Sequence, residues 1–438
     1  MNSSIRIFAG CAVMAVATLT APAALSSQGR GAAADQADDP VRALVGRLDL
    51  EKYKATIKGL TQFGDRRQGT DRNRAAVDWI EAQLRSYGCQ NVERIRYEYN
   101  APAPRGNTAG AAGRGGAGRG AAGAAGAGRA GAAGARGGGG RAANPSGIVS
   151  GPGGSRIFGL RARTGVNNDS MAQKDPAIRA VNMQPATNGM REQVVCMKVG
   201  TTRPDEMYII GGHMDGHGWG QAANDDGSGT AIVMELARIF SMPDVQTDRS
   251  IRFALWNNEE TGLNGARAYI AQRQAMQGKE DPVGSGRYPE PKWLGMIQHD
   301  MMLWDHGMPL ADGTVPKEQR PEADVNVEFQ IDSKMADASM RLAFEFHRAN
   351  NKYATDYPAT VGPHMTNTDS GPFQDIIASI SLRENERGAQ IGGGWDPNWH
   401  QPSDVYTTYS DKDFRLGLNA AQTTLGAVGI LTGAKLKP

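Results

Sequence analysis

The glycine-rich residues 208–229 carry acid and imidazole side chains close together in the chain. The candidates among them for a metal site are His213, Asp215, Asp225 and Asp226. A mixture of imidazole and carboxylate donors suits Zn²⁺ or a similar divalent cation. The two-residue step from His213 to Asp215 suits a ligating histidine whose other ring nitrogen is held by a carboxylate. Taken alone, the loop is as typical of a solvated turn as of a metal site.

The residues on either side of this loop predict the elements that position it. Residues 207–210 are apolar and partly β-branched, which indicates a buried strand. Residues 227–240 have helical spacing, with Ile232, Leu236 and Ile239 on one face. The loop is therefore expected at the carboxyl end of a strand, where open α/β sheets bind their ligands.

Three later segments add donors of the same kind. The apolar residues 251–256 run directly into Glu259 and Glu260. Successive side chains at a strand end diverge, so one glutamate can bind metal while its neighbour faces a substrate. Residues 294–298 lead to Asp300, and the segment WDPNWHQPSD carries His400.

In residue type and order, these segments resemble the secreted co-catalytic di-zinc exopeptidases. This is the family of the bacterial leucyl-type aminopeptidases and plasma glutamate carboxypeptidase. The resemblance runs from about Tyr53 to the C-terminus apart from one insert. It implies that the chain holds two Zn²⁺ ions, with Asp225 bridging them. It further implies that one ion is completed by His213 and Asp300 and the other by Glu260 and His400.

The same resemblance assigns catalytic roles. It implies that Glu259 is the general base and that a cis peptide bond joins Asp225 to Asp226. Asp215 is expected to support His213. The resemblance also places residues 64–69 near the rim of the site. We interpret His217 and His299 as polar lining or as groups that support the ligands.

The chain as a whole predicts an α/β protein. We expect a three-layer sandwich in which helices cover both faces of a mixed, mostly parallel, twisted sheet. Residues 39–438 are predicted to form one peptidase domain. Thr70 is predicted to cap a helix that stops at Gly88, and Ser410 with Asp413 predicts a capping box on the last helix.

Two segments stand apart in composition. Residues 1–27 have the pattern of a secretory signal peptide, which predicts a secreted or periplasmic protein without a stable membrane anchor. Residues 101–143 consist largely of Gly, Ala and Arg and are predicted to be disordered. Their six arginines account for the positive charge, because without them the formal net charge falls from +2 to −4. Residues 101–143 include no aromatic residue on which a base could stack, so we expect no nucleic-acid partner. Cys89 and Cys196 are consistent either with a disulfide or with two buried thiols.

These observations predict a zinc-dependent hydrolase that removes N-terminal residues from peptide substrates. A carboxypeptidase or dipeptidase is the alternative, and Arg383 is its candidate for binding a terminal carboxylate. A glutaminyl cyclase-like acyltransferase is disfavoured by the full set of five ligands. An inactive binding module is disfavoured because Glu259 accompanies that set.

Overall fold

A computed structural model of the chain describes residues 39–101, 148–150, 157–160, 166–307, 314, 316–363, 368–384 and 396–437. The predicted signal peptide and nearly all of the Gly/Ala/Arg insert lie outside the described residues. Residues Pro40–Pro438 form one compact unit. Among the described residues, no helix combines the length and the apolar character of a membrane span.

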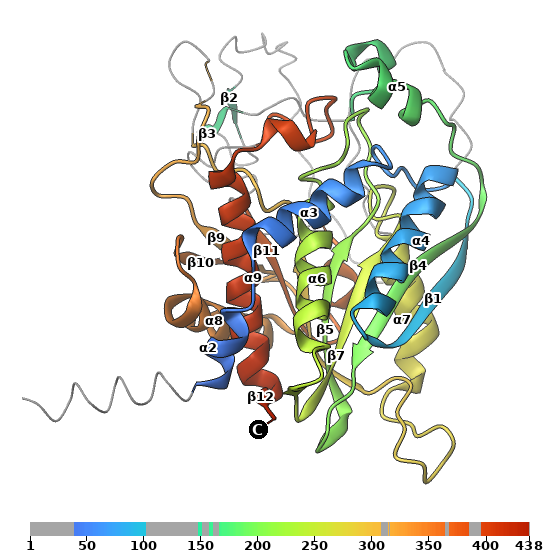
Figure 1. Ribbon diagram of the computed structural model, residues 1–438, viewed down its shortest axis with the longest axis vertical. Helices are drawn as coiled ribbons and strands as arrows, with labels where there is room; N and C mark the ends of the chain where they lie inside the picture. Colours follow the sequence, from blue (N-terminus) through green and yellow to red (C-terminus); the bar gives the residue numbers. More distant parts are fainter. Residues whose placement is uncertain are drawn as a thin grey trace, which may run out of the picture. The chain divides into compact units, whose positions relative to one another are not determined.

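An eight-stranded sheet runs through this unit, in the order β1-β4-β7-β5-β8-β11-β9-β10 (Figure 1). The strands are β1 Gln90–Tyr99, β4 Gly189–Lys198, β5 Arg203–His213, β7 Arg249–Trp256, β8 Lys292–His299, β9 Val325–Phe329, β10 Ala359–Gly362 and β11 Ala378–Arg383. The pairs β7-β5, β5-β8, β8-β11 and β9-β10 are parallel, and the other three are antiparallel. The sheet is therefore mixed and mostly parallel, as predicted.

Helices pack on both faces of the sheet. The helices of the described residues are α2 Pro40–Val45, α3 Leu50–Thr61, α4 Asp71–Ser86, α5 Pro176–Asn182, α6 Gly227–Phe240, α7 Asn264–Arg273, α8 Ala336–Tyr353 and α9 Asp411–Thr432, of which α5 joins neither apolar cluster described below. Along β7, Phe253 and Leu255 join one buried apolar cluster, while Ala254 and Trp256 join a second. Alternate strand residues point to opposite faces, so the two clusters lie on opposite sides of the sheet. The larger includes residues of α2, α3, α4, α6, α8 and α9, and the smaller includes residues of α7. This confirms the three-layer α/β architecture.

Helix boundaries follow the predicted local signals. The Thr70 side chain accepts a hydrogen bond from Asn73 N at the start of α4, and Gly88 follows the helix with a φ of +77°. Ser410 and Asp413 form the predicted capping box of α9. The remaining short elements are η1 Ser170–Ala172, η2 Gln274–Met276, η3 Gly371–Phe373, η4 Tyr406–Thr408, β2 Ile148–Ser150, β3 Ile157–Leu160, β6 Val245–Gln246 and β12 Lys435–Leu436.

Three local features became clear only in the structure. Residues 39–63 form two helices, α2 and α3, and Asp49 between them caps α3 through Lys52 N. Strand β3 pairs with β2 and does not join the main sheet. Cys89 and Cys196, for which two states were open, form a disulfide.

Candidate metal centre

Three neighbouring parallel strands present their carboxyl ends to the candidate site. In the order β7-β5-β8, His213 ends β5, Glu259 and Glu260 follow β7, and Asp300 follows β8. The register pairs His213 with Trp256 and Gly211 with Gln298. Continuing that register brings Asp300 beside His213. The predicted strand-end donors thus meet at one edge of the sheet.

The turn into α6 directs two adjacent aspartates to different tasks. The bond between Asp225 and Asp226 is cis, as the resemblance implied. Asp226 caps α6 by accepting from Gly229 N at 2.8 Å, and it also accepts from His213 N at 2.9 Å and Met301 N at 3.2 Å. Its carboxylate is therefore fully used in joining the strand ends to α6. The carboxylate of Asp225 instead lies among the imidazoles.

One group of donors consists of His213, Asp225 and Asp300. His213 Nε2 lies 3.3 Å from Asp225 Oδ1 and 3.8 Å from Asp300 Oδ1. The other ring nitrogen, Nδ1, lies 2.9 Å from the backbone oxygen of Asp215. A carbonyl oxygen only accepts, so Nδ1 donates and the lone pair of a neutral ring is on Nε2. That lone pair is available to a cation.

A second group consists of His217, Glu260 and His400. Glu260 Oε2 lies 2.8 Å from His400 Nε2 and 2.9 Å from His217 Nε2. Asp225 connects the two groups, because its Oδ1 faces His213 and its Oδ2 lies 3.0 Å from His400 Nε2. The predicted five ligands are all present in the two groups, and His217 is an addition to them.

Buried oxygens test whether this donor set fits cations. Asp225 Oδ2 and Glu260 Oε1 accept no hydrogen bond from the described residues. A buried carboxylate oxygen without a donor is costly unless a positive charge meets it. Asp225 Oδ2 lies 3.0 Å from His400 Nε2, and the other Glu260 oxygen, Oε2, lies between His217 and His400. Nitrogen with carboxylate oxygen is a donor mixture suited to zinc-like ions. The residues present therefore fit a pair of divalent cations.

Glu259 occupies the position next to these groups but belongs to neither of them. Its backbone amide donates a 3.0 Å hydrogen bond to Asp215 Oδ1. We expected that carboxylate to hold the ring of His213. The residue was predicted correctly but the atom was wrong. Asp215 Oδ1 is 3.9 Å from His213 Nδ1, and the backbone carbonyl of Asp215 makes the hydrogen bond instead. The chain turns back after β5, which aims the carbonyl at the ring and the carboxylate at the β7 loop.

The electrostatics of the centre favour positive charge. Burial opposes charge on His400, yet the Glu260 and Asp225 carboxylates raise its pKa to about 10. Burial likewise opposes charge on Glu260, but His217 and His400 lower its pKa to about 2. For Glu259, burial together with the Glu260 carboxylate raises the pKa well above its ordinary value. The carboxylates next to imidazoles are thus ionised, whereas Glu259 holds a proton readily.

A buried arginine fixes the loop between the two groups. Arg66, which is 0% exposed, donates from Nε to Met214 O at 2.7 Å, from Nη1 to Gln221 O at 2.8 Å and from Nη2 to Ala222 O at 2.7 Å. These carbonyls lie near the two ends of the loop that carries His217. The expectation that residues 64–69 approach the site is met through Arg66, which contacts the backbone of the metal loop.

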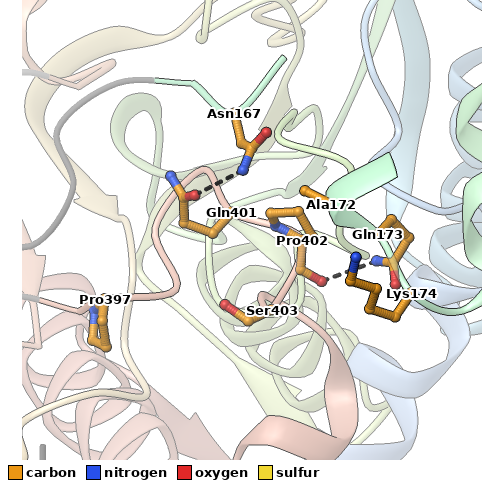
Figure 2. A pocket seen from close by; sticks show the side chains of 8 residues that line it. All are labelled: Asn167, Ala172, Gln173, Lys174, Pro397, Gln401, Pro402 and Ser403. Carbon is orange, nitrogen blue, oxygen red and sulfur yellow. Dashed lines mark hydrogen bonds between the residues drawn. The ribbon is translucent and has the colours of Figure 1, made fainter. Parts of the chain in front are cut away.

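Hydrogen bonds from residues 167 and 173 fix the backbone of the loop that carries His400. Asn167 N donates to His400 O at 3.0 Å, and Gln173 Nε2 donates both to Trp219 O and to Pro402 O. Asn167 and Gln173 also line a pocket of about 500 Å³, where Asn167 bonds Gln401 and Gln173 bonds Pro402 (Figure 2). None of the eight lining residues belongs to either donor group. We therefore regard this pocket as part of the support of the His400 loop.

Two further predicted residues have other partners. Arg383 is 1% exposed, and its guanidinium lies 3.2 Å from Asp300 Oδ2 and 3.2 Å from Glu328 Oε2. It is therefore committed to two carboxylates, one of them on a candidate ligand. The ring nitrogens of His299 bond Gly211 O and Thr424 Oγ1, and burial lowers the pKa of this histidine to about 4. His299 thus joins β5 to α9 through the two nitrogens of its ring.

Sequence reasoning missed the part played by His217 and by Asp404. Asp404 accepts from the backbone amides of Asn224 at 2.9 Å and Asp225 at 3.2 Å, and so fixes the turn that carries Asp225. The HxDxH spacing at residues 213–217 was a usable signal for His217. No local pattern marked Asp404, because its partners lie about 180 residues away.

Comparison with known proteins agrees with this geometry. A probable lipoprotein aminopeptidase, LpqL, of Mycobacterium tuberculosis is 26% identical over 259 residues, which cover 57% of this chain and 47% of the relative. Carboxypeptidase Q of Xenopus laevis is 37% identical over 71 residues, or 16% of this chain and 15% of the relative. The chain thus spans about half the length, or less, of these curated relatives.

The fold is also found among solved structures. A zinc aminopeptidase from Bacillus subtilis superposes with a TM-score of 0.51 at 14% identity, covering 89% of this chain and 96% of that one. The model of peptidase family M28 matches residues 193–422, which is more than half of the chain and includes every residue of both donor groups. The chain belongs to peptidase family M28.

Proposed function

We propose that the protein is a zinc-dependent aminopeptidase that hydrolyses N-terminal residues from peptides. The observation that carries the proposal is the position of Glu259 beside two groups of donors that share Asp225. Zinc is supported by the mixture of imidazole and carboxylate donors, and a solved relative of the same fold is named a zinc aminopeptidase. His213 and Asp300 would complete one zinc site with Asp225, and Glu260 and His400 the other.

Two zinc ions held here would polarise the scissile carbonyl and acidify a water for attack. Glu259 would take the proton of that water and deliver it to the leaving amine. Asp215 would fix the backbone of this base through its hydrogen bond to Glu259 N.

The charge of the site favours a substrate with a free amine. Glu259 lies near enough to Asp369 and Asp300 for both carboxylates to raise its pKa. A peptide α-ammonium group would be attracted to this negative region. A carboxypeptidase needs a cation for the terminal carboxylate instead, and Arg383 is already paired with Asp300 and Glu328. Carboxypeptidase Q among the relatives keeps that activity as the second candidate.

Matched substrates separate the two candidates. We expect aminoacyl-nitroanilides with a free amine to be cleaved, and their N-acetylated counterparts to be resistant. N-blocked dipeptides with a free carboxylate should also be resistant. A zinc chelator should abolish cleavage, and added Zn²⁺ should restore it. Cleavage of the blocked dipeptides alone would show a carboxypeptidase.

We further propose that residues 39–438 act as one peptidase domain in a secreted or periplasmic protein. The disulfide between Cys89 and Cys196 supports an oxidising compartment, because such bonds rarely persist in a reducing cytosol. Peptides are the proposed partners, and no nucleic acid is expected. Cell fractionation with an antibody to the chain would test the location, and recovery in the cytoplasmic fraction would contradict it.

A further inference from the structure

His217 is held against the second donor group by the course of its own loop. Gly218 follows it with a φ of +99°, and a side chain there would lie 2.3 Å from the backbone carbonyl carbon and oxygen of His400. Only glycine allows so close an approach. As a result the rings of His217 and His400 lie edge to face, with centroids 4.1 Å apart.

Both imidazoles direct one nitrogen at the same carboxylate oxygen. His217 Nε2 and His400 Nε2 lie 2.9 Å and 2.8 Å from Glu260 Oε2. Although it is that close to an acceptor, the buried His217 Nε2 forms no hydrogen bond within the described residues. The direction of the contact is therefore unlike that of an N–H donor. If His217 Nε2 instead carries a lone pair, that lone pair and Glu260 Oε2 lie close enough to bind one cation between them.

We propose that His217 is an additional protein ligand to the metal ion held by Glu260 and His400. The inference rests on the proposed zinc function and adds a donor to it. The two metal positions then differ in composition. One has His213, Asp225 and Asp300, whereas the other has His217, Glu260, His400 and the second oxygen of Asp225.

This difference has a chemical consequence. Four protein donors complete a tetrahedral zinc site, which is typical of structural zinc, while three leave a position open. The ion held by His217 should therefore bind more tightly and exchange more slowly. The position at His213 should be the one that retains an open site for water or substrate. Two imidazoles also favour zinc over Mg²⁺ or Ca²⁺ at the tighter position.

The test measures metal binding and does not depend on catalysis. Wild-type full-length protein is stripped with chelator and titrated with Zn²⁺ by calorimetry, beside H217A, H217Q and H347A. His347 lies on α8, outside both donor groups, so H347A controls for the loss of a histidine. Glutamine keeps the size and polarity of the side chain and lacks the imidazole donor.

We expect two zinc ions to bind to wild type and to H347A. In H217A and H217Q, one ion should bind as in wild type, and the other at least about tenfold more weakly. If both His217 variants bind two ions as tightly as wild type, the side chain is only an ion partner of Glu260 and the proposal is overturned. Failure of wild type itself to bind two ions would instead count against the proposed function.

A second measurement uses only the wild-type chain and so does not depend on how a variant folds. In the Co²⁺-loaded protein, each ligating histidine gives a paramagnetically shifted ring N–H proton signal in the NMR spectrum. Three such signals are expected, from His213, His217 and His400. Two signals would overturn the proposal.

Discussion

The backbone amide of Glu259 donates a 3.0 Å hydrogen bond to the carboxylate of Asp215. This bond joins the loop after β7 to the loop after β5. The carbonyl of the same aspartate holds Nδ1 of His213 at 2.9 Å. Asp215 therefore connects a candidate metal ligand with the candidate base, and the relative position of the two depends on it.

Removing the Asp215 side chain should lower turnover more than binding. In D215A the buried amide of Glu259 loses its acceptor, so we expect kcat to fall about 10- to 100-fold while KM changes little. D215N is the matched control, because its side-chain oxygen can still accept from Glu259 N. Steady-state kinetics on an aminoacyl-nitroanilide checks this. Equal losses in the two variants would show that the charge of Asp215, and not its hydrogen bond, matters.

Glu259 and Glu260 are adjacent but should respond differently to the same substitution. E259Q removes the proposed base, and we expect kcat to fall at least about a thousandfold with two zinc ions retained. E260Q removes a candidate ligand and should lose one zinc ion. Metal content after gel filtration, measured beside activity, separates the two effects. Loss of metal in E259Q with retention in E260Q would mean that their roles are exchanged.

Asp225 contacts a histidine of each donor group, His213 through Oδ1 and His400 through Oδ2. In D225A both zinc positions lose a donor, so we expect the affinity for both ions to fall. D226A is not a suitable comparison, because Asp226 fixes three backbone amides. The better control is D300A, which should weaken only the position at His213. Calorimetric titration with Zn²⁺ checks this, and an unchanged second ion in D225A would contradict the bridging role.

Arg66 should contribute strongly to stability. R66M leaves the carbonyls of Met214, Gln221 and Ala222 without their buried donor, which should cost about 3 kcal/mol or more. R67M makes the same substitution at the exposed neighbouring arginine and should change stability by less than about 0.5 kcal/mol. Urea denaturation measures both. If the two variants unfold at the same urea concentration, Arg66 does not fix the loop.

The stability of the metal-free protein should fall as the pH rises. Burial raises the pKa of Asp404 to about 7 and of Asp396 to about 6, and Tyr409 Oη lies 3.0 Å and 3.3 Å from these two carboxyl groups. In the unfolded chain the pKa of an aspartate is about 3.9, so above that pH the folded state retains protons that the unfolded state has lost. The stability that these two carboxyl groups contribute is fully present below pH ~3.9 and is lost as the pH rises through about 7.

His400 contributes with the same sign, whereas His299, whose pKa burial lowers to about 4, opposes the decline up to about pH 6.5. The pKa of His400 is raised to about 10, against about 6.5 in the unfolded chain, which extends the decline above pH 7. We expect the unfolding free energy of chelator-treated protein to drop by roughly 3 kcal/mol between pH 5 and 8. Zinc should reverse the trend, since its binding displaces these protons. Stability that rises with pH in the metal-free protein would contradict this assignment.

The amino-acid sequence by itself determined the elements and the chemistry they carry. Apolar runs ending in His213, Glu259 and Asp300 predicted strands whose carboxyl ends meet, because parallel neighbouring strands end at one edge of a sheet. The caps at Thr70 and Ser410 were equally readable, since each depends on residues within one helical turn. Family M28 was recognisable from the same segments.

The tertiary structure decided what depends on partners distant in the chain or on which atom faces a neighbour. Cys89 and Cys196 are 107 residues apart, and the pairing of β1 with β4, which sets Gln90 opposite Met197, brings them together. The carbonyl of Asp215, and not its carboxylate, faces His213 because of the turn after β5. His217 joins Glu260 and His400 because Gly218 lets two loops touch. Residue types and order predict which donors exist, whereas loop paths decide which of them meet.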